Sequence, residues 1–233
     1  MREIIRYSHR EHPVDITAGF QTLSGNLTLP ERARGLVLFA HGSGSSRFSP
    51  RNRYVAEVLN QAGLGTLLFD LLTPDEESED ALSGEYRFNI GLLADRLAGA
   101  TDWVIAQPET KGLNIGYFGA STGAAAALMA AGQRRTQVDA IVSRGGRPDL
   151  AGPFLKNVTA PTLLIVGSED YEVLKLNRLA FQQLQCKKEM MLVSGATHLF
   201  EEPGTLGDVA QAASQWFTQY LNKPGHVHPV AER

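Results

Sequence analysis

Three separate segments of the 233-residue chain carry side chains that together could perform nucleophilic catalysis. Residues 119–123 read Gly-Ala-Ser-Thr-Gly, in which Ser121 lies between two glycines that permit a sharp turn. Asp170 and His198 follow later in the chain, in the order in which a carboxylate and a histidine accompany such a serine. A serine hydroxyl is a weak nucleophile unless a neighbouring base, itself oriented by a third group, removes its proton. The sequence therefore predicts acyl chemistry with Ser121 as nucleophile, His198 as base and Asp170 as acid.

Other residues compete for two of these roles. Glu169 adjoins Asp170, and Asp149 follows the preceding predicted strand, so either carboxylate could orient the base instead. We favour Asp170 because it lies just past a buried strand, and His198 because it lies between the last predicted strand and the final helix. His41 is expected to brace the loop after an early strand rather than to act as a second base.

Two backbone amides are candidates for binding the oxyanion of a tetrahedral intermediate. The amide of Thr122 directly follows the nucleophile, and the amide of Ser43 lies in the glycine-rich segment 41–44, where backbone can approach a ligand closely. Losing one such donor typically lowers turnover by ~10²–10³. A flexible loop without a catalytic role is the alternative for the segment that holds Ser43.

Two arginines could choose the substrate. Arg144 and Arg147 lie in the segment 143–149, directly after a predicted buried strand. Guanidinium groups at that position could bind a substrate carboxylate or phosphate through paired hydrogen bonds. The alternative is that they form ion pairs with Asp149 or with an acidic loop. A second group of arginines is expected to form a solvated face at the start of a helix, although Arg47 could instead reach an anionic substrate: Arg47, Arg51 and Arg53.

The elements that must position these residues alternate along the chain. Apolar runs predict strands over residues 14–16, 21–29, 36–40, 65–70, 113–118, 138–142, 162–166 and 189–193. Helical patterns cover residues 49–63, 89–106, 122–131 and 205–221, with further helical segments between the later strands. Runs that are apolar throughout suit a mostly parallel sheet with helices on both faces. Ligands bind at the carboxyl ends of the strands in such sheets, and the candidate residues follow strands.

Two segments lack a clear place in this alternation. Residues 73–85 are polar and acidic without an apolar stripe, so we expect a solvated loop there, with a mobile lid as the alternative. Residues 223–233 are expected to form a flexible C-terminal tail. The preceding residues, 1–222, have the length and apolar content of a single domain.

Composition restricts the partners. The chain has 22 Lys and Arg against 25 Asp and Glu, so its net charge of −3 offers no broad attraction for nucleic acid or an anionic membrane. No segment approaches the roughly 20 apolar residues that span a bilayer. Cys186 is the only cysteine, which excludes an internal disulfide and fits a reducing compartment. We expect a cytoplasmic protein that acts on a small molecule, with no metal and no organic cofactor; the sequence carries no signature of an oligomeric state.

The chain resembles the dienelactone hydrolase-related branch of the α/β-hydrolases over residues 36–221. The resemblance rests on His41 and Gly42 after an early strand, on the turn at Ser121, on Asp170 and on the Gly-Ala-Thr-His-Leu-Phe segment 195–200. It implies an α/β-hydrolase fold with a compact sheet and no large cap domain. Dienelactone hydrolases proper carry cysteine where this chain has Ser121, so ordinary ester hydrolysis is expected.

The function that these observations favour is hydrolysis of a small carboxylic ester, lactone or thioester through an acyl-enzyme. An acyltransferase would use the same three residues with an acceptor other than water. A binding protein that keeps the fold without turnover is the alternative from another class, because a fold does not by itself establish an activity.

Overall fold

A single mixed sheet organises the chain, whose computed structural model describes residues 11–133 and 137–222. Its strands occur in the order β1-β2-β4-β3-β5-β6-β7-β8. The strands are β1 (Glu11–Ala18), β2 (Gln21–Thr28), β3 (Leu36–Ala40), β4 (Gly65–Phe69), β5 (Ile115–Ala120), β6 (Ala140–Arg144), β7 (Thr162–Gly167) and β8 (Lys188–Val193). β1 and β2 run antiparallel to their neighbours, whereas all pairs from β4 to β8 are parallel.

The parallel strands form the centre of the molecule because their sequences are apolar or small at nearly every position. Every residue of β3, β4, β5, β6 and β7 is buried, as expected for strands covered on both faces. β8, at the edge, alternates between partly buried and exposed residues until it reaches Val193. The apolar runs thus place the sheet interior between two layers of helices.

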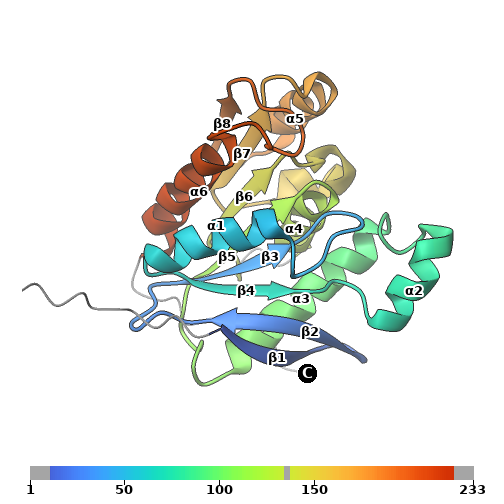
Figure 1. Cartoon of the computed structure of the whole chain (residues 1–233), viewed down its shortest axis with the longest axis vertical. Helices are drawn as coiled ribbons and strands as arrows, with labels where there is room; N and C mark the ends of the chain where they lie inside the picture. Colours follow the sequence, from blue (N-terminus) through green and yellow to red (C-terminus); the bar gives the residue numbers. More distant parts are fainter. Residues whose placement is uncertain (1–10, 134–136, 223–233) are drawn as a thin grey trace, which may run out of the picture.

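The two helical layers are unequal (Figure 1). One layer contains α1 (Pro50–Gln61) and α6 (Thr205–Leu221), which share one buried apolar cluster with the sheet. The other contains α3 (Ile90–Ala106), α4 (Thr122–Gln133), the 3₁₀ helix η1 (Pro148–Asn157) and α5 (Tyr171–Gln183). The alanines of α4 are fully buried, which lets this helix lie close to the sheet directly behind the turn at Ser121.

Most of the segment 73–85 forms a helix, so the expectation of a solvated loop was wrong. α2 (Pro74–Ser83) begins with a capping box, in which the Thr73 hydroxyl accepts from the Glu76 amide and the Glu76 carboxylate accepts from the Thr73 amide. Gly84 ends it in the left-handed conformation. Asp80 is the only buried residue of α2, so the helix needs no apolar stripe and its sequence shows none. Figure 1 shows α2 at the margin of the molecule, beyond the carboxyl ends of β3 and β4.

The central strands run farther than their apolar runs. β5 continues to Ala120 and β6 to Arg144, two residues past the predicted ends, because their last residues pair in register with each other. Ser121 therefore follows the final ladder pair directly, and Arg144 is a strand residue.

The architecture confirms the predicted fold class: a mostly parallel sheet with helices on both faces, and no large cap domain. Within the described ranges, no helix combines the length and the apolar character needed to cross a membrane. That residues 1–222 form one domain stays a prediction, and the tail expected at 223–233 lies outside the described residues.

Candidate active site

The turn from β5 into α4 holds Ser121 in a backbone conformation that few residues adopt. Ser121 has φ 51°, one of the positive values found at non-glycine residues of the described chain. A Cβ on Gly123 would lie 2.1 Å from the Ala40 carbonyl oxygen, and one on Gly119 would lie 2.4 Å from the Ala124 Cα. Only glycine fits at either position, so the two glycines of the motif are required by close packing around the serine.

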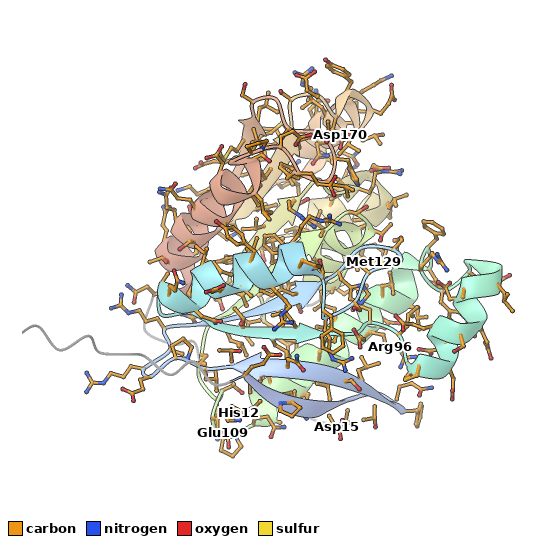
Figure 2. All side chains as sticks on the ribbon, viewed as in Figure 1. His12, Asp15, Arg96, Glu109, Met129 and Asp170 are labelled. Carbon is orange, nitrogen blue, oxygen red and sulfur yellow. The ribbon has the colours of Figure 1, made fainter. Side chains whose placement is uncertain are left out.

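Asp170 and His198 are brought together from loops 28 residues apart in the chain. The Asp170 Oδ2 atom lies 2.7 Å from the His198 Nδ1 atom, and the side chains are 13% and 39% exposed. Figure 2 shows Asp170 in the part of the molecule formed by β7 and α5. This bond leaves the other ring nitrogen, Nε2, as the atom that could accept a proton.

The two competing carboxylates have other partners. Asp149 receives two hydrogen bonds from Arg147, Nε to Oδ1 at 2.9 Å and Nη2 to Oδ2 at 2.8 Å. Glu169 accepts from the Ser168 hydroxyl at 3.1 Å. Of the three carboxylates that the sequence offered, Asp170 is the one that contacts His198.

The loop that carries His198 is anchored close to β7 and β6. A Cβ on Gly167 would lie 2.2 Å from the Ala196 carbonyl oxygen, so this loop can approach the end of β7 only where a glycine lies. Phe200 is 2% exposed and packs into the core beneath the loop. Among the described residues, the Ser121 hydroxyl forms no hydrogen bond to His198.

The two candidate oxyanion donors lie side by side, and one already has a partner. The Ser43 amide donates to the Thr122 hydroxyl at 3.0 Å, and the two hydroxyls are 2.9 Å apart. Gly42 packs directly against the serine, because a Cβ on Gly42 would lie 3.0 Å from the Ser121 Cβ. The sequence placed both amides next to the serine, but the side-chain contact between Ser43 and Thr122 was not foreseen.

His41 braces the loop, as the sequence predicted. Its Nε2 atom accepts from the Leu71 amide at 3.1 Å, so Nδ1 carries the proton and donates to the Gly42 carbonyl at 3.0 Å. Burial lowers the pKa of His41, although its backbone hydrogen bond and the charges of Asp70 and Glu77 act in the opposite direction. The neutral imidazole, with one hydrogen bond at each ring nitrogen, connects the end of β3 to the end of β4.

The arginines separate into paired and unpaired groups. Arg147 forms the ion pair with Asp149, and this hydrogen bonding raises its pKa. Arg144 is 8% exposed, and its Nε and Nη1 atoms have no hydrogen-bond partner. Arg47 pairs with Asp70 and is only 22% exposed, so the expectation of a solvated face was wrong for this residue.

A cavity of about 520 Å³ adjoins the loop that holds Ser43. Its lining includes His41 and Ser46 from the segment after β3, and Asp80 and Arg87 from α2 and the turn after it. The Ser43 hydroxyl donates to the Arg87 carbonyl at 3.3 Å, which connects these two segments. The sequence analysis did not identify Asp80 or Arg87. The capping box at Thr73 was the available signal, because it predicts the helix that contains Asp80.

Comparisons with known proteins agree with this architecture. The model of the family described as the dienelactone hydrolase family matches residues 30–223. Proteins from two strains of Mycobacterium tuberculosis, CDC 1551 and H37Rv, are 57% identical over 216 residues and carry the provisional name of a phosphoribosyl transferase. The match covers 93% of this chain and 48% of each relative, so the chain spans about half the length of these curated relatives.

Two solved structures illustrate the range of similarity. A dienelactone hydrolase from Anabaena variabilis is 59% identical, with a TM-score of 0.90 over 91% of this chain and 99% of that one. Est1E from Butyrivibrio proteoclasticus is 16% identical, with a TM-score of 0.75 over 91% of this chain and 99% of that one. The second likeness concerns the fold alone.

Proposed function

The chain belongs to the dienelactone hydrolase family, and we propose that it is a serine hydrolase that cleaves a small carboxylic ester, lactone or thioester. The observation that carries the proposal is the 2.7 Å contact between His198 and Asp170 at the same sheet edge as the strained turn of Ser121. A nucleophile, a base and an orienting acid are the complete set that acyl transfer to a serine requires.

In the proposed reaction, the Ser121 hydroxyl oxygen attacks the substrate carbonyl carbon while His198 Nε2 takes the hydroxyl proton. Asp170 accepts a hydrogen bond from Nδ1 and stabilises the imidazolium that forms. Collapse of the tetrahedral intermediate breaks the bond to the leaving group, which receives the proton from His198. Water then repeats the sequence on the acyl-enzyme, with His198 again as base, and restores the Ser121 hydroxyl.

The oxyanion is proposed to bind the amides of Thr122 and Ser43. In the structure the Ser43 amide donates to the Thr122 hydroxyl, so a carbonyl oxygen that enters must replace this acceptor. Rotation of the Thr122 side chain would release the amide without moving the backbone. The exchange replaces one neutral hydrogen bond with one to a developing negative charge, which is the stronger of the two.

The nucleophile is proposed to be serine although dienelactone hydrolases proper use cysteine at this turn. Cys186 is a poor candidate for the role, because its thiol contacts Thr162, the first residue of β7, at the opposite end of the strand from Asp170. Burial also raises the pKa of the Cys186 thiol, which disfavours the reactive thiolate. A single free thiol fits the reducing cytoplasm, where we propose that the protein acts.

Two other activities remain as candidates. An acyltransferase would share the acyl-enzyme and differ only in the acceptor. The phosphoribosyl transferase name belongs to relatives about twice as long as the matched segment. We assign any such activity to the half of those relatives that this chain does not match, because a serine, histidine and carboxylate serve acyl transfer.

A serine-reactive fluorophosphonate probe tests the proposal. The probe should label the purified protein and should fail to label Ser121→Ala, while a Cys186→Ala control keeps the label. A panel of p-nitrophenyl esters with increasing acyl length should be hydrolysed in parallel. Acceleration by an added alcohol, with formation of the new ester, would favour the acyltransferase. Absence of labelling and turnover in well-folded protein would leave the binding protein as the better reading.

A further inference from the structure

Among the residues that the structure describes, Arg144 is a buried cation without a compensating anion. The residue is 8% exposed, and of its side-chain nitrogens only Nη2 has a partner there, the Asn52 Oδ1 atom at 3.4 Å. Nε and Nη1 are buried and make no hydrogen bond. A buried charge without a partner costs several kcal/mol, on the order of the net stability of a small domain. Arg147, three residues later, avoids this cost because its side chain is partly exposed and forms an ion pair with Asp149.

The surroundings of Arg144 add positive charge. Asn52 belongs to the first turn of α1, whose N-terminus carries a partial positive charge and has no acidic residue in that turn. Arg51 lies in the same turn, and its Nε atom is also buried without a partner. Burial and the nearby charge of Arg51 lower the pKa of Arg144 to about 10. Within residues 11–133 and 137–222, the only carboxylate bound by Arg51 is that of Glu201, whose side chain is 66% exposed and lies 3.1 Å away.

The site adjoins the proposed reaction centre. Arg144 ends β6, and its carbonyl accepts from the Ser121 amide at 3.3 Å. The next residue, Gly145, packs so closely that a Cβ on it would lie 3.1 Å from the His198 carbonyl oxygen. The backbone of residues 144 and 145 therefore contacts the segments of both Ser121 and His198, and the Arg144 side chain extends from there to Asn52 on α1.

We propose that Arg144, with Arg51 and the N-terminus of α1, binds a phosphate group carried by the ester substrate. Nε and Nη1 of Arg144 lie on different edges of the guanidinium, so a phosphate would accept from one of them and from Nε of Arg51. Two guanidinium charges match the dianion of a phosphate monoester, whereas a carboxylate carries a single negative charge. This inference rests on the proposed function in one respect: the phosphate is taken to be part of the ester substrate.

Binding of inorganic phosphate tests the subsite independently of turnover. Phosphate should raise the Tm of the Ser121→Ala protein, and Arg144→Met should weaken the phosphate Kd by about 10- to 100-fold. The unliganded Arg144→Met protein should melt at the same temperature as its parent or higher, because the unpaired buried charge is gone. Arg53→Met is the matched control on α1: its side chain is 54% exposed, and phosphate binding should not change.

Other results would overturn the subsite. Absence of phosphate binding, equal binding in Arg144→Met, or acetate binding at least as tightly as phosphate would each do so. If Arg144→Met does not fold, Arg144→Lys decides, because it keeps the charge but loses the planar fork and should still lose roughly tenfold in affinity.

A paired substrate connects the subsite to the chemistry. The acetyl ester of a phosphorylated alcohol should have a higher kcat/KM than the ester of the same alcohol without phosphate, and Arg144→Met should remove this advantage. Two results separate this inference from the proposed function. If phosphate binding depends on Arg144 but turnover survives Ser121→Ala, the proposed function is wrong and the phosphate subsite stands. If turnover needs Ser121 but the protein does not bind phosphate, the subsite is wrong and the proposed function stands.

Discussion

Asp170 occupies the N-cap position of α5, yet its carboxylate bonds His198 at 2.7 Å and makes no hydrogen bond to the helix. Aspartate is among the preferred N-cap residues, and a cap of this kind contributes about 1 kcal/mol. The helix therefore begins without the side-chain hydrogen bond that its N-cap residue could supply. That carboxylate is used to hold an imidazole from another loop, which is expected of a site residue rather than of a structural one.

Asp170→Asn should lower ester turnover by about 10⁴-fold, because the amide disfavours both the required tautomer of His198 and its imidazolium. Asp149→Asn is the control, since its carboxylate pairs with Arg147 and does not contact His198. Initial rates with a p-nitrophenyl ester, measured beside thermal melting, check both variants. A larger loss in Asp149→Asn than in Asp170→Asn would show that the acid was assigned to the wrong strand end.

Gly123→Ala should destabilise the protein by about 1–3 kcal/mol or more, because the added Cβ would overlap the Ala40 carbonyl oxygen at 2.1 Å. Gly91→Ala offers a matched control within α3, where the nearest atom to the new Cβ is Asn89 Oδ1 at 3.5 Å. There the substitution should be neutral or stabilising by up to about 1 kcal/mol. Urea denaturation of the two variants measures the difference, and equal losses would contradict the close approach of α4 to β3.

His41 should make the protein less stable as the pH falls. Burial lowers the pKa of His41 from its ordinary value of 6.5, so below that value the unfolded chain binds a proton that the folded chain refuses. The stability contribution is complete above pH ~6.5 and is lost as the pH decreases toward the lowered pKa. His41→Gln should show a smaller decrease in Tm between neutral and mildly acidic pH. Identical pH profiles for the two proteins would mean that other groups cause the dependence.

Glu76→Ala should cost about 3 kcal/mol or more, because it removes the capping box of α2 and leaves Arg96 without its carboxylate. Arg96 on α3 is only 10% exposed at its side chain, and its Nη2 atom lies 2.6 Å from Glu76 Oε1. Asp75→Ala changes an exposed acid in the same first turn and should alter stability by less than about 0.5 kcal/mol. Chemical denaturation compares the pair; similar losses would argue against the buried ion pair as the link between α2 and α3.

Local sequence patterns were enough to predict the parallel strands, the helices other than α2 and the strand ends at which Ser121, Asp170 and His198 lie. These features follow from local patterns: apolar runs make buried strands, and glycines on both sides of Ser121 permit one sharp turn. The strand ends of a parallel sheet share one edge, so residues distant in the chain could be placed in one region before any contact was known.

The packing of the elements was needed to show which side chains pair. Arg144 and Arg147 have the same charge and lie at the same strand end, but Arg147 contacts Asp149 two residues later, whereas Arg144 is buried against α1 without a carboxylate partner among the described residues. The helix α2 is a different case, because its capping box at Thr73 and Glu76 is a local signal that could have predicted the helix even without an apolar stripe. Pairing depends on distances between elements far apart in the chain, and such distances arise only when the helices pack on the sheet.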